Sequence, residues 1–264
     1  MARIGVAATA PFGADVLERL AGRHDVAFLL TQPDRPAGRG RRVSPPAAKQ
    51  VAARLGIPVL QPDRLDDPVE LPAETIVLVA YGKLVPVALL DRHLWLNVHP
   101  SLLPRWRGAA PVERAIMAGD EETGVAIIRL VEELDAGPIG ALERFPIGPD
   151  DDAGAVYERA AGVAARLLDP LPESFGPQPE EGVTYAEKIT AADRELELSQ
   201  PADELVRRVR ALSPHIGARA ELGGRPVIVW RGRTGADGSF EPIEVQPQGG
   251  RRMQYDAWLR GLRS

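Results

Sequence analysis

LNVHPSLLPRWRG, residues 96–108, combines the end of a buried strand with a polar turn. Its first residues are apolar apart from Asn97 and His99, and Pro100 ends the strand because proline cannot donate to a ladder. Side chains two residues apart in a strand point the same way, so we expect Asn97 and His99 on one face. An amide beside an imidazole suits acyl transfer, because the amide can donate to an oxyanion while the imidazole moves a proton or stabilises charge. An isolated pair of this kind would be explained more simply as buried polar groups that bond to loop carbonyls.

Apolar runs before this stretch predict the fold class. Residues 3–8, 25–31 and 75–80 are nearly all apolar, as expected of strands buried on both faces, and residues 12–20 and 47–55 have helical spacing. This alternation predicts an α/β fold with a Rossmann-like, mostly parallel sheet and helices on both faces. The turn after the first strand lacks the G-x-G-x-x-G string that brings backbone against a pyrophosphate, which disfavours dinucleotide binding.

Composition favours a soluble, cytoplasmic globular protein with one larger and one smaller domain. The 264 residues are 44% hydrophobic, and no apolar run approaches the ~20 residues that cross a bilayer. The start lacks a signal pattern, and the absence of Cys excludes disulfides, a thiolate nucleophile and a zinc ribbon. The formal net charge of -5 argues against general affinity for nucleic acid. Residues 193–264 nevertheless hold 12 Arg against 10 acidic residues, which permits an RNA partner.

The second half of the chain predicts a change of architecture. Residues 168–182 are rich in Pro and Gly, which is typical of a linker. Residues 201–212 have the spacing of an amphipathic helix, and the segments around Gly223-Gly224 predict a hairpin followed by at least one more strand. Asp135 lies before this region, in the acidic loop 132–137, where composition alone favours a solvated turn.

The string NVHPSLLPRWRGAAP, residues 97–111, resembles the signature of the formyltransferases that use 10-formyltetrahydrofolate. LDAG, residues 134–137, is similar to the turn that carries the catalytic acid of this family. Four further strings resemble, in the same order, the branch of the family that formylates methionyl-tRNA: QPDRPAGRG (32–40), VAYG (79–82), GDEETG (119–124) and TYAEK (184–188). The resemblance covers most of the chain and is loosest at its end.

The resemblance implies a catalytic set of Asn97, His99 and Asp135. Asn97 and protonated His99 would stabilise the oxyanion that forms when an amine attacks the formyl carbon, while Asp135 would orient His99 and relay the proton of the amine. The donor, 10-formyltetrahydrofolate, would lie beyond the carboxyl ends of neighbouring strands. No metal is expected. The residues expected to bind the donor are Tyr81, Gly82, Ser101, Leu102, Leu103 and Pro104.

Methionyl-tRNA is the acceptor that the resemblance implies. Residues 32–46 contain four Pro and two Gly, which predicts a loop, and Arg39, Arg41 and Arg42 in it could contact phosphates. Composition alone would leave such a loop in solvent, whereas in the related enzymes it reaches the end of the acceptor stem. Neither a membrane nor a stable protein partner is implied.

The resemblance also implies the domain organisation. We expect a catalytic formyltransferase domain over residues 1–175, a linker over 176–192, and a small OB-like β-barrel over 193–264. The last domain is shorter than usual, as if a strand or hairpin after Arg231 were missing.

Three other functions remain open. An N-formyltransferase for another amine, such as an amino sugar nucleotide, would share the catalytic residues but is not expected to keep the arginine-rich loop. A formyltetrahydrofolate hydrolase usually carries an amino-terminal regulatory domain, and this sequence begins directly at its first strand. A regulatory RNA-binding relative would have no need of Asn97, His99 and Asp135.

Overall fold

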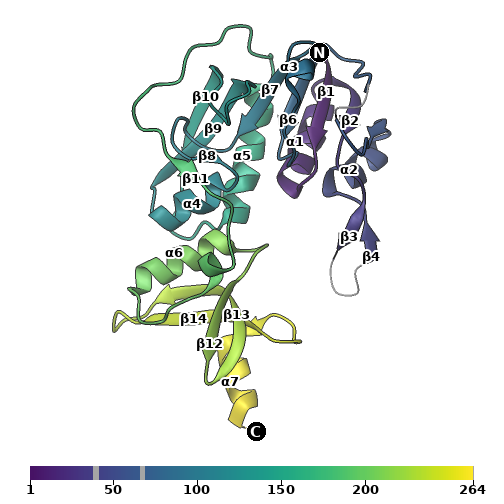
Figure 1. Ribbon diagram of the computed structural model, residues 1–264. Coiled ribbons are helices and arrows are strands. Elements are labelled where there is room, and N and C mark those ends of the chain that lie inside the picture. Colours follow the sequence, from purple (N-terminus) through teal and green to yellow (C-terminus); the bar gives the residue numbers. More distant parts are fainter. Residues whose placement is uncertain (38–41, 66–68, 264) are drawn as a thin grey trace. The chain divides into compact units, whose positions relative to one another are not determined.

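The chain folds into two compact units whose segments alternate along the sequence. The computed structural model describes residues 1–37, 42–65 and 69–263 (Figure 1). One unit, here called the sheet unit, comprises Met1–Arg107, Gly124–Arg144 and Glu158–Thr184. The other, the tail unit, comprises Gly108–Thr123, Phe145–Tyr157 and Tyr185–Ser264. The predicted domain boundaries at residues 175 and 193 stay a prediction.

The central sheet has seven strands in the order β10-β9-β7-β6-β1-β2-β5. Adjacent strands in the part of the sheet from β7 to β5 pair in parallel. Strand β9 pairs antiparallel to β7. The mostly parallel sheet predicted from the sequence is therefore confirmed. Its strands are β1 (Arg3–Ala8), β2 (Asp25–Leu30), β5 (Val59–Leu60), β6 (Thr75–Val79), β7 (Leu94–His99), β9 (Glu122–Arg129) and β10 (Ile139–Pro146).

Burial explains why these strands read as continuous apolar runs. Five of the six residues of β1 and of β7 are buried, so both faces of the sheet are covered. On one face Phe28, Ile76 and Trp95 belong to one apolar cluster. Helices α1 (Pro11–Ala21), α2 (Ala47–Leu55) and α3 (Val87–Leu90) lie between strands of this sheet, and α5 (Ala153–Leu167) follows its last strand, β10. Strand β10 escapes sequence reasoning because its residues are mostly half-buried or exposed and include Gly, Glu and Arg.

The segment predicted as an irregular loop instead forms a hairpin. Strands β3 (Arg35–Ala37) and β4 (Arg42–Ser44) pair antiparallel, with Pro36 opposite Val43. Both strands of a two-stranded ribbon are edges, where proline is tolerated, and this is why proline did not exclude strands here. Arg39 and Arg41 lie outside the described residues, and Arg42 begins β4.

The tail unit is built on a four-stranded antiparallel sheet in the order β12-β13-β14-β15. The predicted hairpin about Gly223-Gly224 is confirmed, and the tail predicted as a small OB-like β-barrel is an antiparallel β domain. Leu205, Val209 and Leu212 of α6 pack into an apolar core with this sheet, as the helical spacing predicted. The elements of this unit are α4 (Pro111–Ala118), α6 (Ala202–Leu212), β12 (Ala218–Leu222), β13 (Arg225–Thr234), β14 (Phe240–Pro247), β15 (Met253–Gln254) and α7 (Tyr255–Arg263).

One short strand precedes α4, and another follows the proline-rich segment. β8 (Arg107–Gly108) and β11 (Tyr185–Ala186) form a two-stranded sheet. Helix α4 begins at Pro111, because the preceding backbone is bonded to a strand. Across the described ranges of the chain, we find no helix with both the length and the hydropathy that a bilayer crossing requires.

Candidate active site

Strand β7 carries Asn97 and His99 to its carboxyl end, where they share a face as predicted. Asp135, from the loop between β9 and β10, contacts both side chains. Asn97 Nδ2 donates to Asp135 Oδ1 over 3.0 Å, and His99 Nδ1 lies 3.6 Å from Asp135 Oδ2. All three residues are at most 7% exposed. The structure thus brings together the three residues predicted to be catalytic.

The ring of His99 faces an oxygen at each nitrogen. Nδ1 faces the Asp135 carboxylate, and Nε2 lies 2.8 Å from the carbonyl oxygen of Trp106. A carbonyl can only accept, so Nε2 carries a hydrogen in this contact. A ring protonated at both nitrogens satisfies both neighbours, which is the state that a charge-stabilising imidazole requires.

The loop that carries Asp135 is closed tightly at its base. Arg129 N–H donates to the Pro138 carbonyl over 3.0 Å. A Cβ at Gly137 would lie 1.8 Å from the Arg129 carbonyl oxygen, so only glycine fits there. Asp135 itself has a φ of 48°, a left-handed conformation that few non-glycine residues adopt. The exposed turn that composition favours is wrong for Asp135, because this backbone directs its carboxylate to buried partners.

Trp106, on the other side of His99, also has left-handed backbone, with a φ of 64°. Its N–H donates to Thr184 Oγ1 over 2.9 Å, and the next N–H, of Arg107, donates to the Thr184 carbonyl over 2.9 Å. Thr184 therefore fixes the peptide whose carbonyl receives His99 Nε2. This contact gives a structural role to the first residue of the TYAEK string.

The residues predicted to bind the donor lie at the ends of β6 and β7. The two strands are adjacent and parallel, so their carboxyl ends share an edge of the sheet. The backbone carbonyl of Tyr81 accepts from Thr9 Oγ1 and Gln32 Nε2 at 2.9 and 2.8 Å, whereas its ring is buried. That burial raises the pKa of the Tyr81 phenol to about 12, so the phenol stays neutral. Gly82 follows with a φ of 79°.

The turn after β7 holds the other four predicted donor-binding residues. Ser101 is fully buried, and its Oγ donates to the Arg105 carbonyl over 2.7 Å. This bond orients the hydroxyl within its own turn rather than toward His99, so nothing in the geometry makes Ser101 a nucleophile. Leu103 and Pro104 are buried and Leu102 is half-buried.

Comparison with known proteins identifies the family. The family model described as Formyl transferase matches residues 3–169, and the model described as Formyl transferase, C-terminal domain, matches residues 188–237. The chain belongs to the formyl transferase family. A relative from Halorhodospira halophila, named methionyl-tRNA formyltransferase, is 42% identical over 301 residues, covering 99% of this chain and 97% of the relative.

Two solved structures share the fold. Methionyl-tRNA formyltransferase from Clostridium thermocellum has a TM-score of 0.63 at 13% identity, covering 96% of this chain and all of that one. HypX from Aquifex aeolicus, in complex with tetrahydrofolic acid, has a TM-score of 0.64 at 17% identity, covering 98% of this chain and 46% of HypX. At these identities the likeness concerns the fold alone.

Two residues of this formyl transferase that sequence reasoning missed support the loop that carries Asp135. Gln178 Nε2 donates to the carbonyls of Asp135 and Gly137 over 2.6 and 2.8 Å. Gln178 Oε1 accepts from Arg107 Nε and Nη2 over 3.2 and 2.8 Å. Gln178 lies in a proline-rich segment, where no local sequence pattern indicates a functional residue. Arg107 is recognisable in the sequence only as one residue of the family signature.

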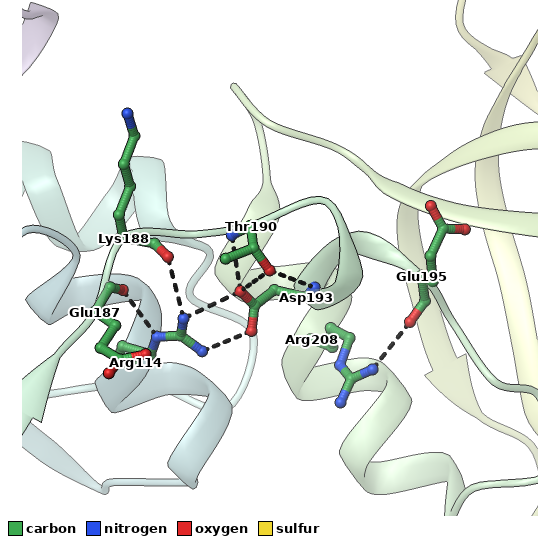
Figure 2. A network of polar contacts seen from close by, with 7 residues as sticks. All are labelled: Arg114, Glu187, Lys188, Thr190, Asp193, Glu195 and Arg208. Atoms are coloured by element: carbon green, nitrogen blue, oxygen red, sulfur yellow. Dashed lines mark hydrogen bonds and ion pairs between the residues drawn. The ribbon is translucent and has the colours of Figure 1, made fainter.

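The rest of the TYAEK string, in the tail unit, is fixed by Arg114 of α4 (Figure 2). Arg114 makes two bonds to the Asp193 carboxylate, at 2.7 and 3.1 Å, and donates to the carbonyls of Glu187 and Lys188. Thr190 donates to Asp193 through both N–H and Oγ1. The Arg114 guanidinium is the main reason why the pKa of Asp193 lies well below its usual range. The side chain of Lys188 extends away from this network.

A cavity of about 490 Å³ in this formyl transferase lies in the tail unit. The described residues that line it include Arg207 and Arg210 of α6 and none of the predicted site residues. Arg207 pairs with Asp203, and Arg210 donates to the carbonyls of Gly148 and Asp151. These guanidinium groups have structural partners, so the cavity presents no evident ligand site.

Proposed function

We propose that this formyltransferase transfers the formyl group of 10-formyltetrahydrofolate to the amino group of methionyl-tRNA. The observation that carries this conclusion is the 42% identity, over nearly the whole length of both chains, to a relative named methionyl-tRNA formyltransferase. The buried contacts of Asn97, His99 and Asp135 support the chemistry, because they place an amide donor, an imidazole and a carboxylate together.

The proposed reaction is direct attack of the amine nitrogen on the formyl carbon. The carbonyl π pair moves to oxygen and forms a tetrahedral oxyanion. One hydrogen of the Asn97 amide is used in the bond to Asp135, and the second would donate to this oxyanion, with protonated His99 stabilising the charge. Asp135 would orient His99 and accept the proton of the amine. The oxyanion then collapses, the bond to N10 of the donor breaks, and Asp135 passes the proton it took from the amine to that nitrogen.

The donor would bind at the shared carboxyl edge of β6 and β7. The buried ring of Tyr81 leaves its backbone, with Gly82, to approach a flat pterin. The apolar turn of Leu102, Leu103 and Pro104 would supply packing surface close to His99. Tetrahydrofolic acid bound to HypX is consistent with a folate at this fold, and the placement in this chain rests on the residues named here.

The acceptor would be bound by two regions. The β3–β4 hairpin, with Arg39, Arg41 and Arg42, would contact phosphates at the end of the acceptor stem. The weakly basic residues 193–264 would add contacts to the RNA backbone, so we keep the division into a catalytic region up to residue 175 and an RNA-binding tail as part of this proposal. Charged initiator tRNA as acceptor would place the enzyme in the cytoplasm.

One assay tests the proposal against its rivals. Purified protein is given 10-formyltetrahydrofolate with charged initiator methionyl-tRNA, with free amines including an amino sugar nucleotide, or with water alone. We expect efficient formylation of the methionyl-tRNA, far above the rate with the free amines. Preferential formylation of the sugar nucleotide would make the chain a sugar N-formyltransferase, and release of formate without an acceptor would make it a hydrolase.

A further inference from the structure

Arg107 and Gln178 form a pair, here called the Gln178 clamp, beneath the loop that carries Asp135. The pair joins three segments of the sheet unit that are distant in sequence: the turn after β7, the β9–β10 loop and the proline-rich segment. Gln178 bonds the backbone of the Asp135 loop directly, whereas Arg107 also follows Trp106, whose carbonyl receives His99 Nε2.

The amide of Gln178 is fully used. Both lone pairs of Oε1 accept from Arg107, and both hydrogens of Nε2 are donated to the carbonyls of Asp135 and Gly137. Rotating the amide by 180° would put its NH₂ against a guanidinium and its oxygen against two carbonyls. Arg107 therefore sets the orientation of the amide, and the amide sets the position of the loop.

Arg107 is a buried cation with little compensating charge. Its side chain is 9% exposed, and its charged partner Glu133, at 3.4 Å, is 73% exposed. The bonds to Gln178 are shorter than the contact with Glu133, at 2.8 Å for Nη2. Burying a charge is costly unless the group is well bonded, so this arrangement needs a reason.

The backbone of Asp135 supplies that reason. Its φ of 48° is left-handed, and such conformations persist only where surrounding contacts determine them. Gln178 bonds the carbonyl of Asp135 itself at 2.6 Å and that of Gly137 two residues later. These bonds lock the peptide from which the carboxylate reaches Asn97 and His99.

We propose that Arg107 and Gln178 are positioning residues that hold Asp135 in its catalytic orientation. This inference rests on the proposed function, in which Asp135 orients His99 and accepts the proton of the amine. A misplacement of about 1 Å can cost on the order of 10²-fold in rate, so loss of the clamp should appear in kcat rather than in KM for methionyl-tRNA.

The test is a double-mutant cycle of Gln178→Glu with Asp135→Asn in the full-length protein. Glutamate keeps the shape and the acceptors toward Arg107 but removes both donors and places a carboxylate oxygen against two carbonyls. We expect Gln178→Glu to lower kcat by about 10²-fold. In the Asp135→Asn background the same change should lower kcat by less than about 3-fold, because the group being positioned is already absent. Ser174→Glu adds the same charge at an exposed position of the same segment and should leave kcat unchanged.

The outcomes separate the inference from the function on which it rests. A normal kcat for Asp135→Asn would contradict the proposed catalytic set. An impaired Asp135→Asn together with a normal Gln178→Glu would overturn the clamp alone. Equal losses from Gln178→Glu in both backgrounds would make the clamp merely structural and would also overturn the inference. If Gln178→Glu does not fold, as judged by its Tm, the same cycle with Arg107→Lys decides, since lysine lacks the fork that fixes the amide.

Discussion

His99 has an oxygen partner at each ring nitrogen, so removing the ring or its carboxylate partner should affect chemistry more than stability. We expect His99→Ala or Asp135→Asn to lower kcat by roughly 10²- to 10⁴-fold, the usual range for a positioned acid-base group. The measurement is formyl transfer at saturating donor, with circular dichroism to verify the fold. Asp91→Asn, at an exposed carboxylate, is the matched control. Near-normal turnover in either active-site variant would refute the assignment.

Adding a single methyl group at Gly137 tests whether the position of the Asp135 loop matters. A Cβ there would lie 1.8 Å from a backbone oxygen, so Gly137→Ala must displace the Asp135 loop. We expect kcat to fall and the free energy of unfolding to fall by more than about 1 kcal/mol. Gly162→Ala, in α5 with no atom within 4 Å of the added Cβ, should instead be neutral or stabilising by up to about 1 kcal/mol. Denaturant unfolding of both variants gives the comparison, and equal effects would contradict it.

The residues of the candidate site differ in how far sequence could find them. Asn97 and His99 share a face because a strand alternates, and this is local physics that any reader of the sequence can use. Asp135 was found through family resemblance, because its burial depends on a left-handed backbone and a closed loop that composition does not reveal. Gln178 was not found, since its partners lie 41, 43 and 71 residues away.

The β3–β4 hairpin can be tested as an element. Replacing Arg39, Arg41 and Arg42 together by Ala should weaken tRNA binding and flatten its salt dependence, because fewer counterions are released per complex. Folate affinity should not change. The measurement is the slope of log affinity against log salt, and a slope equal to that of the parent protein would show that these arginines do not contact the RNA.

The Arg114–Asp193 pair joins α4 to the segment after the TYAEK string, and it should respond to acid. The pKa of Asp193 is lowered in the folded protein, so its stabilisation is present above the unfolded pKa, about 3.9, and is lost as pH falls through the lower folded value. At pH 7 Asp193→Asn should reduce the free energy of unfolding by about 1–2 kcal/mol, and this difference should shrink below about pH 4. Asp203→Asn, at a 63% exposed carboxylate, should leave the free energy of unfolding nearly unchanged. A difference that does not depend on pH would contradict the ionic account.

The strands and helices predicted correctly are those with strong periodicity. Strands β1, β6 and β7 are mostly apolar, and α6 has a clear apolar face, so local pattern and packing agree. The β3–β4 ribbon and β10 were missed because hydrogen bonds to adjacent strands hold them in place, and their sequences lack the apolar pattern of a buried strand. The short helix α3 and the carboxyl-terminal α7 were likewise not predicted.

At the scale of the whole molecule, the two units are interleaved along the chain, and this affects what a truncation can show. A chain that ends at Gly182 lacks α6, with which α4 packs in the tail unit, and lacks Thr184, which fixes the Trp106 peptide next to His99. We expect this truncated chain to lose amide protection in α4 and to lose catalysis, and not only its preference for tRNA. Hydrogen exchange and formyl transfer by the truncated chain are the measurements. Intact protection of α4 would show that the sheet unit and its insertions fold without the tail.

The interleaving also sets an order of events on the ribosome. Helix α4 is complete at residue 118, whereas α6 begins at residue 202. At about 5–20 residues per second, α4 waits on the order of 5–20 s for the helix against which it packs. During this time Met117 of α4 lacks the apolar core of α6 and the tail sheet against which it packs. Nascent chains stalled before residue 202 should therefore be better clients for chaperones than chains that have released α6.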